Sequence, residues 1–278
     1  MVMPTGVGIT AFWTSVKLVA AVFLAGFVLS WSNAYAVEHV PLEQGAYRVL
    51  HKRDGQFLWQ AWWNVRQEGP DTVMTEHGQG RYRSMPEPVI WDLEVRFSTE
   101  DPFDFHWSKR TVKSPTAPAV GWTVEKRYDK ATGLLTMELW QLDEPRSPRA
   151  YRWNGVKELS TPETLAFIVR DRHGEAVKTF TCMLVTDEPA FYRVIAVIRR
   201  DEIITVPAGK FGCVKVELIP KLGVWGLFGR PFIPKTYLWH TMEPPHYWVK
   251  YEGLESGLHS AHVVMELEAF VPSIPGAL

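Results

Sequence analysis

Three residue types offer reactive or ligand-binding side chains in this 278-residue sequence: two cysteines, nine histidines and thirteen tryptophans. Cys182 and Cys213 lie in segments with strand patterns, and a bond between them would close a loop of about thirty residues. A disulfide requires Cα atoms within about 7 Å of each other, and spacing along the chain does not determine that distance. The sequence therefore leaves two possibilities for these cysteines, a disulfide or two separate buried thiols.

His259 and His262 are the closest pair of histidines in the sequence. Residues three apart share one side of a helix but point to opposite faces of a strand. Their segment has the pattern of a turn that leads into a strand, and no run of acidic residues or cysteines accompanies it. We therefore expect surface histidines, with no metal and no other cofactor.

The motifs of the common enzyme classes are missing or incomplete. Asp92 and Glu94 share a strand face in a spacing that a glycosidase could use, but solvent-facing strand positions are ordinarily charged. Gly253-Leu254-Glu255-Ser256-Gly257 has its serine one place too late for a nucleophile elbow. No G-x-G-x-x-G or phosphate-binding loop is present. The sequence predicts no enzyme, and a carbohydrate-active enzyme is the less favoured alternative.

An apolar loop is the most informative feature of the sequence. Lys221 to Lys235 reads KLGVWGLFGRPFIPK, whereas ordinary connections between strands are short and polar. The loop would plug the open end of a sheet, cover an apolar ligand as a lid, or touch a membrane surface. The predicted ligand contacts come from this loop and the hairpin after it: Trp225, Phe228, Phe232, Trp239 and Trp248.

Composition and patterning predict a mainly β protein. Hydrophobic residues make up 46% of the chain, and 30 basic against 31 acidic residues leave no positive surplus for binding nucleic acid. Short apolar–polar alternations predict about twelve antiparallel strands. Turn signals such as Asp54-Gly55 and Thr132-Gly133 separate them. One helix is expected from Thr161 to Asp171, because Ser160 and Glu163 have the spacing of a capping box.

Residues 1–36 have the pattern of a secretory signal peptide. Lys17 is their single charge, Leu18 to Leu29 is apolar, and Ala34-Tyr35-Ala36 supplies the small residues of a cleavage site. Cleavage after Ala36 would leave one β-rich domain, 37–278, exported to the periplasm of a bacterial cell envelope. The alternative is an uncleaved inner-membrane anchor formed by residues 8–31.

One segment, Ile203 to Glu217, reads IITVPAGKFGCVKVE. This segment resembles the V-P-A-G-x-F-x-x-x-K-V-E hairpin of the bacterial exported proteins of domain-of-unknown-function family 3108. The capped helix before it, and the Leu238-Trp239 and Val249-Lys250-Tyr251 strands after it, are similar to that family in order and spacing. The resemblance implies a curved antiparallel sheet that forms an incomplete barrel, with one central helix against its concave side. It implies no catalytic residues.

A more distant similarity to periplasmic lipoprotein-sorting carriers implies that such a half-barrel could hold acyl chains. We therefore expect an exported envelope protein that binds a lipid-like or other hydrophobic ligand in a half-barrel cavity, with membrane-surface contact through Lys221 to Lys235. The alternative from another class is a structural or interaction protein whose barrel core is filled by its own side chains.

Overall fold

The computed structural model describes residues 43–82, 85, 87–99, 103–144, 148–171, 178–221, 234–256 and 260–272. The expected signal segment and the contacts Trp225, Phe228 and Phe232 lie outside the described residues, so they stay predictions. Within the described ranges, no helix has both the length and the apolar character that crossing a bilayer requires.

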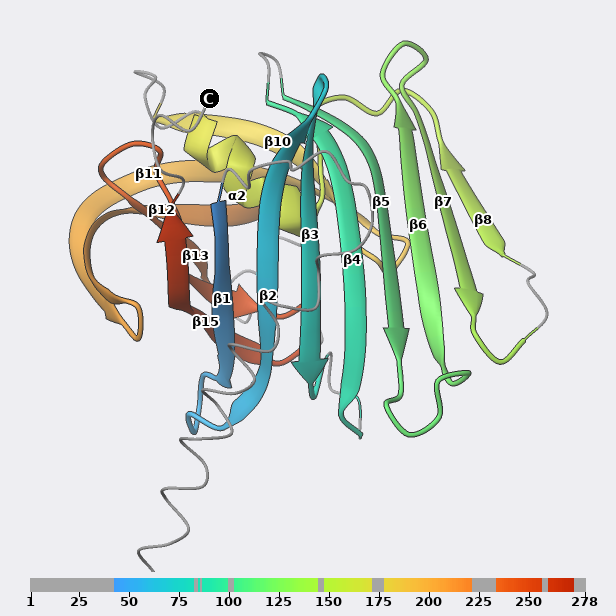
Figure 1. Ribbon diagram of the computed structural model, residues 1–278. Helices are drawn as coiled ribbons and strands as arrows, with labels where there is room; N and C mark the ends of the chain where they lie inside the picture. The colour runs from blue at the N-terminus through green and yellow to red at the C-terminus, as the bar shows by residue number, and fades with distance from the viewer. Residues whose placement is uncertain are drawn as a thin grey trace, which may run out of the picture. The chain divides into compact units, whose positions relative to one another are not determined.

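A single sheet contains all fifteen strands of the described residues (Figure 1), and the strands follow the order β8-β7-β6-β5-β4-β3-β2-β1-β15-β14-β13-β12-β11-β10-β9. The first half of the chain forms β1 (Glu43–His51), β2 (Phe57–Glu68), β3 (Asp71–Gly80), β4 (Val89–Ser98), β5 (Asp104–Lys113), β6 (Gly121–Asp129), β7 (Leu134–Gln141), β8 (Arg149–Trp153) and β9 (Leu159–Ser160). The second half forms β10 (Thr179–Val185), β11 (Phe191–Val206), β12 (Gly209–Lys221), β13 (Thr236–Thr241), β14 (Trp248–Leu254) and β15 (His262–Pro272).

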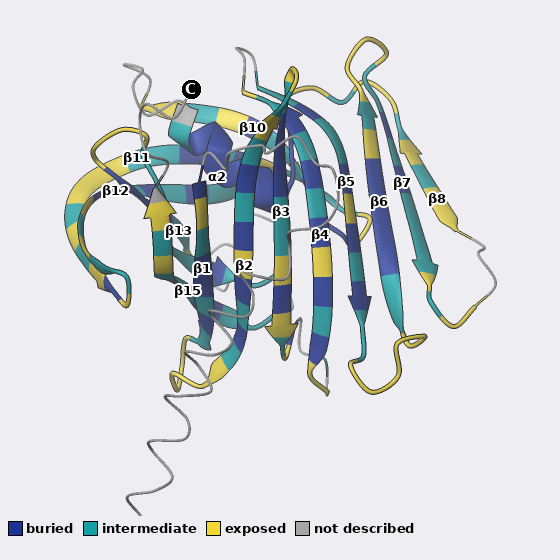
Figure 2. Ribbon diagram, viewed as in Figure 1, coloured by how far each residue is buried: buried dark blue, intermediate teal, exposed yellow. Residues whose placement is uncertain are grey.

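The sheet curves but does not close, because β8 and β9 remain its two edges. Helix α2 (Pro162–Asp171) contacts β4, β9 and β10, and so lies on the concave side between the two halves of the sheet (Figure 1). Most of α2 and alternate positions along the strands beside it are buried (Figure 2). The prediction of a mainly β, incomplete barrel with one central helix is confirmed.

Alternation along the strands determines which side chains fill the concave side. In β2, Trp59, Ala61, Trp63 and Val65 are all at most 7% exposed, as the pattern predicts for one face of this strand. On the helix, Phe167 packs against Phe97 of β4 with ring centroids 4.9 Å apart. The helix and the sheet therefore share one core.

The helix cap differs from the expected one by one residue. The Thr164 backbone N–H donates to Thr161 Oγ1 (3.4 Å), and the Thr161 N–H donates to Thr164 Oγ1 (2.9 Å). Thr161 is therefore the N-cap, and Pro162 occupies the first helical position, where its missing N–H costs nothing. The Ser160–Glu163 pairing was wrong, and Glu163 is left to make other contacts.

Two differences concern strands. Alternation along the sequence gives two separate strands, 191–200 and 202–207, whereas the structure has one strand, β11, which continues through a bulge between Ile198 and Asp201. We did not predict β3, because a glycine, Gly78, takes the place of an apolar side chain at one of its buried positions. At Gly78 a Cβ would lie 2.0 Å from the Trp91 ring, so this close contact excludes any side chain.

The β11–β12 hairpin matches the expected V-P-A-G turn. Val206 pairs with Gly209, and Gly209 has φ of 141°, a conformation that favours glycine. The Ala208 N–H donates to the Leu267 carbonyl of β15 at 3.1 Å. The turn therefore attaches the end of the hairpin to a strand near the middle of the sheet.

Candidate functional site

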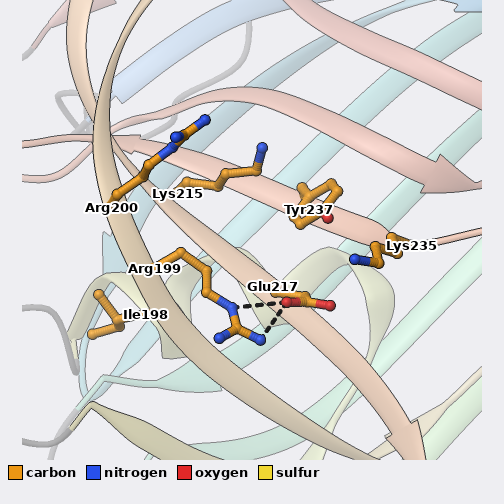
Figure 3. A pocket seen from close by; sticks show the side chains of 7 residues that line it. All are labelled: Ile198, Arg199, Arg200, Lys215, Glu217, Lys235 and Tyr237. Atoms are coloured by element: carbon orange, nitrogen blue, oxygen red, sulfur yellow. Dashed lines mark hydrogen bonds and ion pairs between the residues drawn. The ribbon is translucent and has the colours of Figure 1, made fainter.

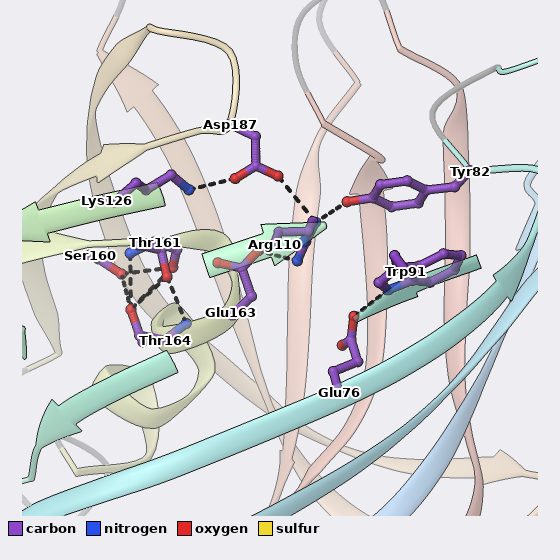
Figure 4. Close-up of polar contacts among 10 residues, drawn as sticks. All are labelled: Glu76, Tyr82, Trp91, Arg110, Lys126, Ser160, Thr161, Glu163, Thr164 and Asp187. Carbon is purple, nitrogen blue, oxygen red and sulfur yellow. Dashed lines mark hydrogen bonds and ion pairs between the residues drawn. The ribbon is translucent and has the colours of Figure 1, made fainter. Parts of the chain in front are cut away.

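Four buried charged side chains form an ionic network on the concave side (Figure 4): Arg110 of β5, Lys126 of β6, Glu163 of α2 and Asp187 of the β10–β11 connection. Arg110 forms ion pairs with Glu163 and, at 3.2 Å, with Asp187. Lys126 Nζ lies 2.5 Å from Asp187 Oδ1. None of these four side chains is more than 6% exposed.

Strand pairing explains how the two cations come together. Lys126 lies opposite Ser108 and Arg110 lies opposite Val124, so both cations point inward from adjacent strands. Two carboxylates balance two cations, which is the condition under which charges persist in a protein interior. The network therefore connects the first turn of α2 and the β10–β11 connection to the sheet.

Glu76 of β3 adds a third acid next to this network. Its Oε1 accepts a hydrogen bond from Trp91 Nε1 at 2.8 Å. Burial raises the pKa of Glu76, against the opposing influence of the Arg110 charge and of the Trp91 hydrogen bond. Burial therefore favours the protonated form of Glu76 in the folded protein.

A small cavity adjoins Glu163, between α2 and strands β1, β2, β3, β13 and β14. It is lined by Glu43, Tyr47, Trp63, Met74, Glu163, Ala166, Phe167, Arg170, His240, His246, Tyr247 and Trp248. Its volume of about 30 Å³ can hold about two water molecules. Binding sites for drug-sized ligands have about 300 Å³ or more, so this cavity as it stands is too small for an acyl chain.

A much larger groove, of about 560 Å³, lies over β11, β12 and β13 (Figure 3). It is lined by Ile198, Arg199, Arg200, Lys215, Glu217, Lys235 and Tyr237. Val216 of β12 packs in one buried cluster with Leu165 of α2. Since successive side chains alternate, Lys215 and Glu217 point to the opposite face. We call this hollow the basic groove; it lies on the outer face of the sheet.

The cations of the basic groove differ in how firmly they are held. Arg199 contacts Glu217 Oε2 through Nε at 2.7 Å and Nη2 at 2.5 Å. Lys215 Nζ lies 4.1 Å from the Tyr237 ring centroid. Lys235 has no hydrogen-bond or ion-pair partner among the residues that the structure describes. Glu202 lies next to the groove and pairs with Arg200 at 2.9 Å and with Lys215 at 3.5 Å. Four cations against two carboxylates, Glu202 and Glu217, still leave the groove with a positive charge.

The structure places the two described ligand contacts on opposite faces of one hairpin. Trp239 lies behind the basic groove, where its ring centroid is 4.8 Å from Lys215 Nζ and its Nε1 donates to Glu202 Oε2 at 3.0 Å. Trp248 lines the small cavity. Trp239 pairs with Lys250, and a bulge then pairs His240 with Trp248. One ligand therefore does not contact both tryptophans in this arrangement.

The two cysteines are free, buried thiols. Cys182 pairs with Val194 on β11, and Val194 pairs with Pro220 on β12, seven residues from Cys213. That offset corresponds to roughly 20 Å along the strand, which excludes the disulfide. Burial raises the pKa of both thiols to about 12.

The remaining candidate residues lie at the surface or outside the described ranges. The Asp92 side chain is 59% exposed and lies 2.8 Å from His77 Nδ1, and the Glu94 side chain is 34% exposed and accepts from Arg96 at 2.9 Å. Both carboxylates therefore lie on the solvent-facing side of β4, as expected. His262 begins β15, whereas His259 lies outside the described residues. No group of three or more His, Cys, Asp or Glu side chains in the described ranges is arranged to hold a metal ion.

Sequence analysis missed the ionic network because of one bulge. Strict alternation would put Phe103, Phe105 and Trp107 on one face. The β4–β5 register instead shifts, so that Arg96 pairs with Trp107 and Phe97 with Phe105. After the extra residue, Ser108 and Arg110 point inward. The segment from Ser108 to Val112 contains a signal, because Arg110 is two residues from the apolar Val112 and so shares its face. Alternation tells which face that is only when the position of the bulge is known.

Comparisons with known proteins identify no family. No family model matches the sequence, and no curated protein matches it. Among solved structures, the chain is similar to a beta-barrel-like protein of domain-of-unknown-function family 1849 from Brucella abortus, with 9% identity, a TM-score of 0.49, and 84% of this chain and 98% of that chain covered.

Two further solved structures are similar at lower TM-scores. One is described as an exported protein with a YmcC-like fold from Bacteroides fragilis, with 12% identity, a TM-score of 0.32, and coverage of 83% and 95%. The other is described as a lipoprotein from Parabacteroides distasonis, with 10% identity, a TM-score of 0.27, and coverage of 82% and 94%. Likenesses at these values establish neither family nor activity, and the resemblance to family 3108 stays a prediction.

Proposed function

We propose that this chain is an exported, non-enzymatic binding protein of the bacterial cell envelope, and that it holds the anionic headgroup of a lipid-like ligand in the basic groove. The observation that carries the proposal is the set of four cations, Arg199, Arg200, Lys215 and Lys235, around about 560 Å³ of open space. Arg and Lys are the side chains that bind phosphate and carboxylate groups most strongly. Such a groove suits an anionic headgroup.

The chemistry of the groove fits one end of an amphiphile. Arg199 is fixed by Glu217, and Lys215 is held against aromatic rings, so both present their charge without further ordering. The Arg200 side chain is 81% exposed although its Nε lies 2.9 Å from Glu202 Oε1, and Lys235 is also exposed, so both can turn toward a ligand. The predicted contacts Trp225, Phe228 and Phe232 precede Lys235 in the chain and would receive the apolar part.

The concave side is the weaker candidate for the ligand. Its cavity holds about 30 Å³, and α2 together with the sheet's own side chains occupies the rest of the core around Phe97 and Phe167. This filling is what the alternative, a structural or interaction protein with a self-filled core, requires. That alternative is the second candidate function.

Binding to vesicles tests the proposal. We expect the protein to sediment with vesicles that contain phosphatidylglycerol, to bind phosphatidylcholine vesicles weakly, and to lose binding in high salt. Each basic side chain near an anionic surface contributes about 1 kcal/mol, so the double variant Arg200→Gln/Lys235→Gln should weaken binding about thirtyfold.

A matched control is available on β8, where Arg149 and Arg152 are also exposed. The variant Arg149→Gln/Arg152→Gln makes the same change in net charge and should bind as the unmodified protein does. Equal weakening by both double variants would mean that net charge, not the basic groove, determines binding. Absence of binding to any vesicle would leave the self-filled structural protein as the better account.

A further inference from the structure

The small cavity beside α2 contains two polar atoms with unused hydrogen-bonding capacity. Trp63 Nε1 and Glu163 Oε2 are both buried, and neither has a hydrogen-bond partner among the described residues. Trp63 is 7% exposed and the Glu163 side chain 6%. A buried polar atom left unpaired costs about 1–3 kcal/mol, so both atoms call for an occupant of the cavity they line.

Several other polar groups of the cavity wall have partners within the protein. Arg170 Nη1 donates to Glu43 Oε2 at 2.7 Å, and the Tyr47 hydroxyl donates to the Trp248 carbonyl at 3.0 Å. His240 Nδ1 lies 3.0 Å from the His246 carbonyl and donates to it. These contacts hold the wall in place. Trp63 and Glu163 add one N–H donor and one carboxylate acceptor to this wall.

The pairing of these two atoms selects the chemistry of the occupant. It must donate a hydrogen bond to Glu163 Oε2 and accept one from Trp63 Nε1. An ammonium group does not accept, and a carboxylate or phosphate does not donate, whereas a hydroxyl group does both. Arg110 already balances the charge of Glu163, so a neutral donor is sufficient.

The rest of the wall suits the carbon atoms next to such a hydroxyl. Tyr47 lies between two tryptophans, with ring centroids 5.8 Å from Trp63 and 4.9 Å from Trp248. Phe167 contributes a further ring from α2. A volume of about 30 Å³ corresponds to about two groups of the size of water, which fits a terminal hydroxymethyl group.

We propose that this cavity is a binding site for the hydroxyl end of a polyol or sugar, with Trp63 as hydrogen-bond donor and Glu163 as acceptor. The proposal is independent of the basic groove, which lies on the opposite face of the sheet. Glycerol and a sugar present the same hydroxymethyl chemistry, and separate titrations distinguish them.

The test is a titration of ¹⁵N-labelled protein followed at the Trp63 indole N–H signal. Glycerol and methyl β-glucoside are the hydroxyl probes, while methylammonium chloride and sodium acetate are probes that only donate or only accept. We expect at least one hydroxyl probe to shift the Trp63 signal in a saturable way at millimolar concentrations, and the two ionic probes to leave it unchanged.

Variants of β2 provide the control. Binding to the variants is followed at the backbone amide signal of Ala166, which lines the cavity. Trp63→Phe keeps a ring but removes the donor, and should weaken binding of the hydroxyl probe about three- to tenfold. Trp59→Phe removes an indole that donates to Glu255 Oε1 instead and does not line the cavity, so it should leave the affinity unchanged. If Trp63→Phe does not fold, the titration of the unmodified protein decides alone.

Three results would overturn the proposal. The first is no saturable shift with either hydroxyl probe up to molar concentration, with only water detected next to the Trp63 indole. The second is a shift with methylammonium or acetate instead of the hydroxyl probes. The third is equal weakening by Trp63→Phe and Trp59→Phe.

Discussion

Removing the charge of Lys126 should destabilise this protein far more than removing a surface charge. The Lys126 side chain is 1% exposed, and its Nζ lies 2.5 Å from Asp187 Oδ1. Lys126→Met fills similar volume but leaves Asp187 with Arg110, at 3.2 Å, as its remaining cation. Breaking a buried ion pair from one side costs about 3–5 kcal/mol, and the remaining Arg110 contact puts the expected loss near the lower end, at about 3 kcal/mol.

The assay is reversible unfolding in urea, supported by thermal melts. For a domain of this size, a loss of about 3 kcal/mol lowers Tm by about 6–12 °C. Lys130→Met is the control, because Lys130 pairs with Asp104 at 3.2 Å while its side chain is 53% exposed. Such a surface pair contributes about 1 kcal/mol or less.

A double-mutant cycle separates the ion pair from packing. Asp187→Asn should cost about as much as Lys126→Met, and the double variant should cost about as much as either one, because the first substitution already breaks the pair. The coupling energy would then be about 2–3 kcal/mol. Losses that simply add, or a Lys126→Met variant as stable as Lys130→Met, would refute the reasoning.

Three further predictions concern the core. Cys182 and Cys213 should resist alkylation by iodoacetamide in the folded protein at neutral pH, since both thiols are buried with pKa values of about 12, and intact-mass measurements check this. Gly78→Ala should cost about 2 kcal/mol or more in urea unfolding, because the new Cβ would lie 2.0 Å from the Trp91 ring; an unchanged midpoint would contradict it. Burial raises the pKa of Glu76 above its ordinary value of 4.5, so the folded state holds that proton more tightly and the associated stability is lost as pH rises through the raised value. Glu76→Gln should therefore gain in Tm relative to the unmodified protein as pH increases above 4.5, and a constant difference in Tm would show that Glu76 does not titrate with folding.

Local signals predicted much of the fold correctly because most strand neighbours in this sheet are also neighbours in the chain. Turns at Asp54-Gly55 and Thr132-Gly133 were expected, and Gly55 and Gly133 have φ of 70° and 64°. The pairing of β1 with β15 joins the two halves of the sheet and has no local signal, since no turn connects these two strands. Only the resemblance to an incomplete barrel indicated that the meanders form one curved sheet.

The candidate sites were harder to predict, because they depend on register and not on residue type. A bulge near His106 turns Arg110 inward, and a shift of one residue in the helix cap frees Glu163 to meet it. Neither event changes the composition or the alternation of a segment by more than one position. The bulge nevertheless moves the Arg110 charge from the solvent-facing side of β5 into the core, where a charge is costly unless it is paired.

The β13–β14 hairpin explains why aromatic content alone was ambiguous. The sequence analysis grouped Trp239 and Trp248 as contacts of one ligand. A bulge between Trp239 and His240 instead places the two side chains on opposite faces of the sheet. On the outer face, Trp239 supports Lys215, so its ring contributes to the basic groove by positioning a cation. On the concave face, Trp248 accepts the Tyr47 hydroxyl through its carbonyl and lines the cavity. A single hairpin therefore supplies one tryptophan to an anion site and one to a hydroxyl site, and loss of either ring should impair one site while leaving the other intact.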